Sequence, residues 1–166
     1  MRRVVTGFDA DGRSTVISDG HAPVQFVSGA GGDDRFGLVR RAGSDAPAEP
    51  GQGVVNELWS LGTEPAITTD DPTLDLQSFI VEVPPGETKW IITQMGPGAG
   101  APMHSTPTID YGLVVAGDIE LGLETGSVHL YAGDSVVMNA VLHSWEAGPK
   151  GCIIATVLVG PRNEDR

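Results

Sequence analysis

Two histidines and one aspartate form the set of side chains best suited to chemistry in this sequence. His104 and His143 each lie beside a short run of β-forming residues, and Asp110 follows shortly after His104. Imidazole nitrogens and a carboxylate oxygen can hold Fe(II), Mn, Ni, Cu or Zn on one face, which leaves positions open for substrate, water or dioxygen. The same groups without a metal ion can act as an acid–base pair.

Strand geometry predicts which of these side chains share a face, because residues i and i+2 point to the same side of a strand. Trp145 therefore accompanies His143, and Thr106 accompanies His104 if that stretch is extended. We predict that these four residues and Asp110 line one cavity. In it, Thr106 and Trp145 contact substrate, with the Thr106 hydroxyl bonding a metal-bound water and Trp145 forming an apolar wall.

Each candidate also has an ordinary structural interpretation. A histidine can bond a backbone carbonyl inside a core, and Asp110 can cap the turn before Tyr111. Thr106 can be a β-branched strand residue with no further role. We favour a site for both histidines and for Asp110, and leave the two interpretations of Thr106 open.

The elements that position these residues are predicted to be strands. The chain has 166 residues with 23 Gly and 12 Pro, and no stretch keeps a helical period over three turns. Short β-branched runs separated by turn residues are typical of an all-β sandwich or barrel. The predicted strands are Arg3–Thr6, Ser14–Ser18, Val24–Val27, Val54–Leu61, Ser78–Val83, Lys89–Met95, Tyr111–Ala116, Ile119–Leu123, Ser127–Tyr131, Ser135–Met138, His143–Glu146 and Ile153–Val159. Turns are expected at Gly117-Asp118, Thr125-Gly126 and Gly133-Asp134.

The most regular part of this pattern predicts a single barrel. Residues 78–160 form a continuous series of hairpins long enough to close a small barrel. Residues 1–77 are expected to form an N-terminal extension of strands and loops that packs on the barrel or on a partner subunit. Residues 161–166 are a C-terminal tail.

Composition narrows the possible partners and the compartment. The formal net charge of −12 opposes binding to nucleic acid or to anionic membranes. No apolar run approaches the roughly 20 residues of a spanning helix, and no signal-peptide pattern follows the N-terminus, so we expect a cytoplasmic protein. Cys152 is the only cysteine, which precludes an intrachain disulfide, and it is predicted to be a small buried apolar residue.

The pattern around the two histidines resembles the cupin superfamily. The first cupin motif runs from a glycine through His-x-His and a glutamate to a second glycine. Every spacing of this motif is matched here, and its positions are occupied by Gly98, His104, Thr106, Asp110 and Gly117. The second motif begins near a glycine-containing turn, here Ala132-Gly133-Asp134, and ends in a histidine followed by an asparagine. His143 fills that histidine position, and Ala147 stands where the asparagine is usual.

The resemblance implies a jelly-roll β-barrel and a metal site made by motif residues. It assigns His104, Asp110 and His143 as ligands, with Asp110 one methylene shorter than the usual glutamate. Thr106 replaces the second histidine of the first motif, and a threonine hydroxyl is a poor ligand for a transition metal. The resemblance therefore implies at most three protein ligands, and it does not indicate a substrate.

The leading functional hypothesis is a metal-dependent cupin enzyme that acts on a small organic molecule. Asp110 and His143 would be its catalytic residues, in isomerisation, decarboxylation, dehydration, cyclisation or dioxygenase chemistry. One alternative is a metal-free enzyme in which the same residues act as acid and base. A second alternative is a non-enzymatic barrel that binds a small molecule. A homodimer is expected, because the extra N-terminal strands leave edges that need covering, and similar small cupins commonly dimerise.

Overall fold

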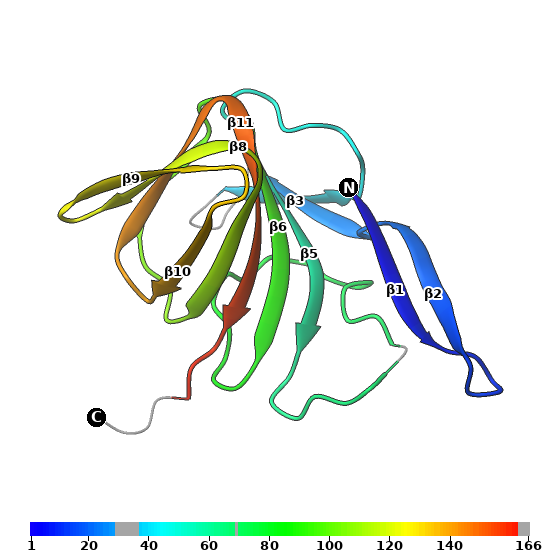
Figure 1. Cartoon of the computed structure of the whole chain (residues 1–166). Helices are drawn as coiled ribbons and strands as arrows, with labels where there is room; N and C mark the ends of the chain where they lie inside the picture. Colours follow the sequence, from blue (N-terminus) through cyan, green and yellow to red (C-terminus); the bar gives the residue numbers. More distant parts are fainter. Residues whose placement is uncertain (29–36, 69, 163–166) are drawn as a thin grey trace.

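A computed structural model describes residues 1–28, 37–68 and 70–162 (Figure 1). This part of the chain contains eleven strands and no helix, which confirms the all-β prediction. The strands are β1 (Arg2–Phe8), β2 (Ser14–His21), β3 (Val24–Ser28), β4 (Leu38–Ala42), β5 (Gly53–Leu61), β6 (Thr88–Met95), β7 (Gly100–His104), β8 (Ile109–Leu123), β9 (Gly126–Tyr131), β10 (Ser135–Asn139) and β11 (His143–Val159). Nothing in the described residues is a helix long and apolar enough to cross a bilayer.

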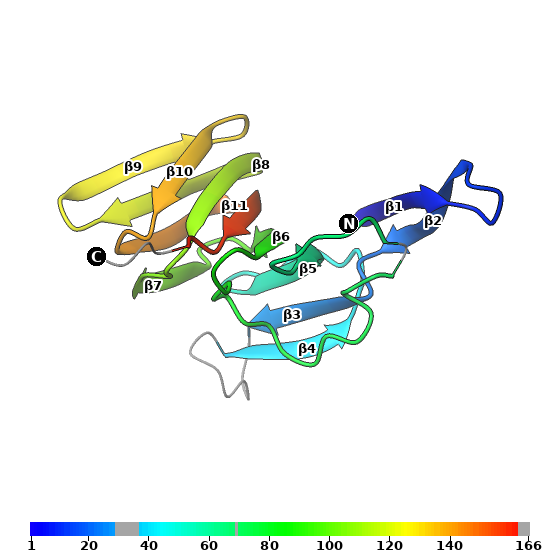
Figure 2. The same cartoon turned by 90° about the horizontal axis from the view of Figure 1, so that it is seen from below.

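Nine of the strands belong to one antiparallel sheet that curls around a core (Figure 2). Its order is β10-β8-β11-β6-β5-β3-β4, with β7 paired to β11 and β9 paired to β8. Strands β3, β4 and β5, which precede residue 78, are therefore hydrogen-bonded into the same sheet as the later strands. β1 and β2 form a separate two-stranded sheet that projects from one side of the molecule.

β8 and β11 are each one long, bent strand, where the sequence predicted two. β8 passes through Gly117, whose φ of 72° lies in the left-handed region that favours glycine. A Cβ at this position would lie 2.0 Å from the Gly151 carbonyl oxygen, so only glycine allows the close approach to β11. The register between the two strands shifts between Ala147 and Cys152. The predicted turn at Gly117-Asp118 was wrong, because the shift bends the strands without ending them.

The segment 78–83 was wrongly predicted as a strand, whereas β4 and β7 were missed. This segment pairs with no described strand, and its Phe79 is buried beside Phe26, with ring centroids 5.9 Å apart. The carbonyl of Ile80 accepts a hydrogen bond from Lys89 Nζ at 2.6 Å, whereas in a strand it would accept one from the backbone of a neighbouring strand. The alternation of apolar residues in 78–83 therefore reflects side chains that enter the core from an irregular segment, and not a strand.

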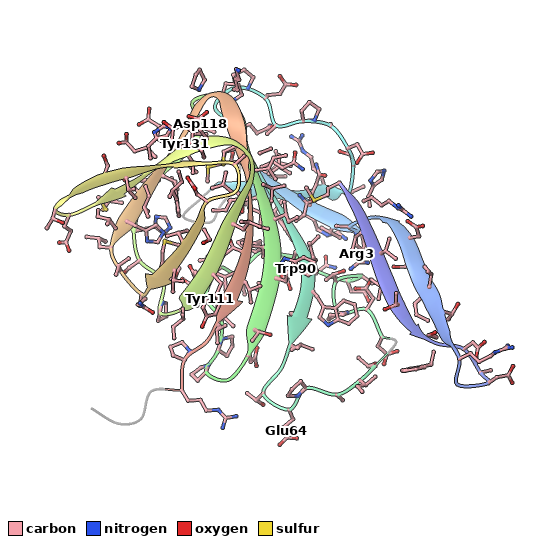
Figure 3. The ribbon with its side chains drawn as sticks, in the orientation of Figure 1. Arg3, Glu64, Trp90, Tyr111, Asp118 and Tyr131 are labelled. Carbon is pink, nitrogen blue, oxygen red and sulfur yellow. The ribbon has the colours of Figure 1, made fainter. Side chains whose placement is uncertain are left out.

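A row of apolar side chains crosses the outer face of the sheet. Register pairing places its members side by side on β10, β8, β11, β6 and β5: Val137, Tyr111, Val157, Trp90 and Trp59. Figure 3 labels Trp90 and Tyr111 in this row. Four of the five are exposed large hydrophobic residues, a feature typical of contact surfaces. The homodimer remains a prediction, and this row is the surface on which it can be sought.

Cys152 lies in the core beside Val114, Ile119 and Ile154. Burial, with a smaller contribution from the negative charge of Asp118, raises the pKa of its thiol to about 11. Because the thiolate is the reactive form, we expect negligible labelling by iodoacetamide in the native protein at neutral pH and rapid labelling in denaturant. Mass spectrometry measures both rates, and equally fast labelling in the two states would contradict this account.

Candidate functional site

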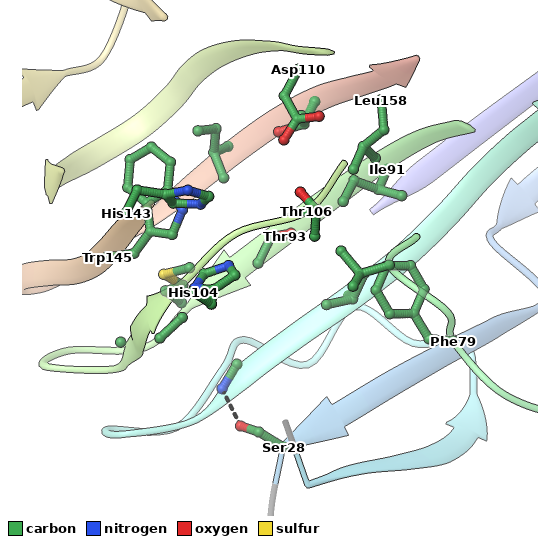
Figure 4. Close-up of a pocket in the computed structure, with 18 of the residues that line it drawn as sticks. Ser28, Phe79, Ile91, Thr93, His104, Thr106, Asp110, His143, Trp145 and Leu158 are labelled. Atoms are coloured by element: carbon green, nitrogen blue, oxygen red, sulfur yellow. Dashed lines mark hydrogen bonds between the residues drawn. The ribbon is translucent and has the colours of Figure 1, made fainter. Parts of the chain in front are cut away.

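The inner face of the curled sheet lines a cavity of about 170 Å³ (Figure 4). All five residues predicted from the sequence line it: His104, Thr106, Asp110, His143 and Trp145. Most of the other lining side chains are apolar, among them Val55, Phe79, Ile91, Met138, Ile154 and Leu158. The structure therefore brings the predicted residues together in a largely apolar hollow with a few polar groups, which is the usual composition of a ligand site.

The two histidines are direct neighbours across a strand pair. β7 pairs with β11 in a register that places His104 opposite His143, and their ring centroids are 4.3 Å apart. In each ring Nδ1–H donates to a backbone carbonyl: His104 to Pro102 at 2.7 Å and His143 to Val141 at 2.9 Å. These bonds place the ring proton on Nδ1 and the lone pair on Nε2, the atom that can accept a proton or bind a metal ion.

Trp145 lies on the same side of β11 as His143, as the strand alternation predicted. Its ring meets the imidazole edge-on, with centroids 5.7 Å apart and planes at 76°. The contact fixes the orientation of the His143 ring from one side, and the Nδ1 bond to Val141 fixes it from the backbone. The buried imidazole is therefore held in one orientation.

Asp110 enters the cavity from the start of β8 and is buried. Its Oδ1 atom is buried and has no hydrogen-bond partner among the described residues. Burial raises the pKa of its carboxyl group above the usual range, although a hydrogen bond from Thr108 and the charge of His143 oppose this shift. A buried polar atom without a partner is rare in proteins and often marks a functional site. Its neighbour Tyr111 faces outward, as predicted.

Thr106 is held by a residue that the sequence analysis missed. The Thr106 and Thr108 hydroxyls are 2.9 Å apart, and both residues are buried. Thr108 also donates to the Asp110 carboxyl, so the three side chains form a chain of hydrogen bonds along one wall. Extending the alternation His104, Thr106, Asp110 by every second residue would have included Thr108.

The cavity wall also contains residues from the first half of the chain, which the motif pattern did not indicate. Ser28 of β3, Leu38 of β4 and Val55 of β5 all line it. Phe79 from the irregular segment completes this side. Their roles depend on strand pairing between distant parts of the sequence, for which spacing alone carries no signal.

The described residues supply only part of a metal centre. Nowhere in the described part of the chain do three His, Cys, Asp or Glu side chains lie close enough to hold one ion. The two imidazoles are adjacent, but Asp110 does not complete a three-ligand set with them, and the Thr106 hydroxyl is engaged by Thr108. These side chains do not form a metal centre by themselves in this conformation, and the predicted ligand roles of His104, Asp110 and His143 remain predictions.

Comparison with known proteins identifies the family. The chain is 30% identical over 152 residues to Phomopsin biosynthesis cluster protein C′ of Diaporthe leptostromiformis, covering 86% of this chain and 68% of that protein. It is 29% identical over 148 residues to the cupin-domain-containing oxidoreductase srdD of Neurospora crassa, covering 86% of this chain and 64% of that protein. The chain belongs to the cupin superfamily. No family model matches it.

Solved cupin structures are also similar to this cupin. An RmlC-like cupin from Shewanella frigidimarina aligns with a TM-score of 0.46 and 15% sequence identity, covering 68% of this chain and 79% of that one. In this cupin Thr106 stands where the motif has its second histidine, and its hydroxyl group is bonded to that of Thr108.

Proposed function

We propose that this cupin is an acid–base enzyme that moves a proton within a small organic molecule, with Asp110 as the acid and His143 as the base. The observation that carries the proposal is the buried, unpartnered Oδ1 of Asp110 in the cavity. Burial favours the protonated carboxyl group, which can donate to a substrate oxygen. The Nδ1 bond of His143 leaves the lone pair on Nε2, as a general base requires.

The reaction is written for a ketone with a hydrogen on the carbon next to its carbonyl. His143 Nε2 removes that hydrogen as a proton, and the electron pair of the broken C–H bond forms a C=C bond. The carbonyl π electrons form a new O–H bond with the proton of Asp110. The product is an enol, with a carboxylate and an imidazolium left on the protein. The imidazolium, after exchange with solvent, then gives a proton to the same carbon or to a conjugated one, and the enol O–H returns its proton to the Asp110 carboxylate. This completes exchange or isomerisation, regenerates both side chains and leaves the oxidation state unchanged.

The other polar residues position these two groups. Thr108 holds the Asp110 carboxyl by a hydrogen bond and is itself bonded to Thr106. His104 packs against the His143 ring, and Trp145 packs on it edge-on. The names of the relatives, two of which describe a biosynthesis cluster protein and an oxidoreductase, support an enzymatic role on small molecules.

Hydrogen exchange with solvent tests the proposal. In D₂O, the protein is expected to catalyse deuterium incorporation next to the carbonyl of small ketones such as acetophenone, monitored by NMR. The variant His143→Gln should lose about 10²-fold or more of this rate, the lower range for loss of a general base. His129→Gln is the matched control, because His129 is exposed and bonded to Asp118 away from the cavity lining. Exchange that is absent for a panel of small ketones, or unchanged in His143→Gln, would refute the assignment.

A second candidate is the metal-dependent enzyme of the sequence analysis. The observation that favours it is the adjacent pair of imidazoles, each anchored through Nδ1 to a carbonyl, which is the usual support of a histidine ligand. A metal ion held there would supply Lewis-acid or redox chemistry, and its other ligands would have to come from outside the described protein groups.

Metal titration separates the two candidates. Under the acid–base proposal, EDTA and added Fe(II), Mn, Ni, Cu or Zn should leave both the melting temperature and the exchange rate unchanged. A metal that binds the native protein at 100 times its Kd would stabilise it by about 2.7 kcal/mol. A rise of the melting temperature with one metal, lost in His104→Gln, would favour the metal-dependent candidate.

A further inference from the structure

We propose that the ligand of this cavity is an uncharged molecule the size of one six-membered ring with a short oxygen-bearing substituent. The inference rests on the proposed function for the identity of the site, and it adds the size, charge and polarity of the substrate. Four features of the cavity carry it: its volume, the polarity of its two ends, the position of its unpartnered polar atom and the absence of Lys and Arg from its described lining.

Volume limits the size of the ligand. The cavity measures about 170 Å³. An apolar cavity of about 150 Å³ in another protein holds one benzene molecule. The cavity here therefore holds one ring and a substituent of a few atoms, and a second ring would have to lie outside this volume.

The two ends of the cavity differ in polarity, which orients the ligand. In Figure 4, His143, Trp145 and His104 lie at one end, and Phe79, Ile91 and Leu158 lie at the other. Phe79, Ile91 and Leu158 are buried apolar residues that belong to one cluster. An apolar ring fits against this cluster, and a polar substituent then faces either the histidines or Asp110, which is paired with Leu158 across β8 and β11.

The unpartnered carboxyl oxygen of Asp110 favours a ligand whose substituent carries an oxygen atom. Asp110 Oδ1 is buried and has no partner among the described residues, so a ligand that bonds it removes the cost of an unsatisfied polar atom. A carbonyl or hydroxyl oxygen can bond the Asp110 carboxyl group. A hydrocarbon of the same size leaves Oδ1 unpaired, and it is expected to bind more weakly.

The lining of the cavity disfavours an anionic substituent. The described lining residues include no Arg or Lys, and the only acidic side chain among them is Asp110. A carboxylate or phosphate would lose its hydration in this cavity with no Lys or Arg side chain of the described lining to pair with it, in a protein whose formal net charge is −12. A ketone or hydroxyl compound carries no such cost.

Three probes of matched size test the inference: acetophenone, benzoate and toluene, titrated at neutral pH by ligand-observed NMR. Acetophenone is expected to bind at least about tenfold more tightly than either of the others. A tenfold difference in Kd corresponds to about 1.4 kcal/mol, which lies within the cost of leaving one buried polar group unpaired. Benzophenone, with two rings, is expected not to bind. Benzoate binding as tightly as acetophenone would overturn the charge assignment, and benzophenone binding would overturn the size.

Neighbouring residues on opposite faces of β11 supply the control. Leu158→Trp fills the cavity and should abolish acetophenone binding, whereas Val157→Trp adds the same bulk to the outer face and should leave binding intact. If Leu158→Trp does not fold, Thr93→Leu, which adds bulk at another lining position, replaces it. Loss of binding in Val157→Trp, or retention in both cavity variants, would place the ligand elsewhere.

The outcome separates this inference from the proposed function. Preferred binding of acetophenone without any deuterium exchange would retain the ligand class and refute the acid–base reaction. Exchange of ketones together with tight binding of benzoate would retain the reaction and refute the ligand class.

Discussion

Replacing Asp110 with asparagine is expected to remove most of the exchange activity and, at the same time, to stabilise the folded protein at neutral and alkaline pH. Asparagine keeps the size of the side chain but has no acidic proton to donate. Loss of a general acid costs about 10²- to 10⁴-fold in rate. A stabilising substitution that destroys activity is the expected behaviour of a group kept in an unfavourable environment for function.

The stability change has a definite pH dependence. The pKa of Asp110 is raised in the folded protein, chiefly by burial. Between the pKa of the unfolded chain and this raised value, the folded protein holds a proton that the unfolded chain has lost, so wild-type stability falls as pH rises. The variant has no such group. Its advantage in melting temperature should therefore grow with rising pH across this window and vanish below the usual aspartate pKa of about 3.9.

The same substitution elsewhere on β8 is the control. Glu120 is exposed on this strand, and Glu120→Gln should change neither the exchange rate nor the melting temperature appreciably. An Asp110→Asn variant that keeps full activity would remove Asp110 from catalysis. A variant that is less stable than wild type at every pH would mean that the carboxylate is satisfied by contacts that asparagine cannot make.

Much of the site could be predicted because strand alternation is a local property. Asp110 faces the cavity and Tyr111 the outer surface, and His143 and Trp145 share a side, all as period-two geometry requires. Short-range spacing could not show that Gly117 bends a continuous strand, because its role depends on the Gly151 carbonyl of β11. The apolar end of the cavity was missed for the same reason, since Phe79 enters it from a segment without strand pairing.

The motif spacing also gave no information on how close Asp110 lies to the two histidines in space. The cupin frame places Asp110 in register with the histidines along the chain, but in the structure it lies at the start of β8, opposite Leu158 near the far end of β11. His143 begins the same strand. Motif spacing therefore predicted a shared cavity and not whether the three groups approach one point.

Removal of the Arg3 side chain is the second change with a large expected effect, and it acts on stability alone. Arg3 is buried and connects β1 to two other parts of the chain. Its Nη1 donates to the Leu58 carbonyl at 3.1 Å, to Thr73 Oγ1 at 2.8 Å and to Asp71 Oδ1 at 3.1 Å, and its Nη2 forms an ion pair with Asp71. Arg3→Ala leaves the mostly buried Asp71 carboxylate without its cation, and breaking a buried pair typically costs about 3 kcal/mol of unfolding free energy.

The pH dependence of this loss has the opposite sign to that of Asp110. Burial alone would raise the pKa of Asp71, but the hydrogen bonds from Arg3 and Thr73 outweigh it, and the pKa lies below its usual value. An acid with a lowered pKa contributes stability that is present above its unfolded pKa and is lost as pH falls through the folded one. The difference between wild type and Arg3→Ala should therefore narrow in acid, as measured by denaturant unfolding at several pH values.

Two further variants separate the ion pair from its surroundings. Arg2 forms a comparable pair with Asp19, but both side chains are exposed, so Arg2→Ala should have little effect on unfolding. The double variant Arg3→Met with Asp71→Leu removes both charges and should recover part of the stability lost in Arg3→Ala, because no buried charge remains unpaired.

Equal losses in Arg2→Ala and Arg3→Ala would mean that burial does not govern these pairs. A double variant less stable than Arg3→Ala would mean that Asp71 acts through Thr73 and its own backbone contacts more than through Arg3. Below the unfolding transition, exchange activity should be unchanged in all of these variants, since neither Arg3 nor Asp71 lines the cavity.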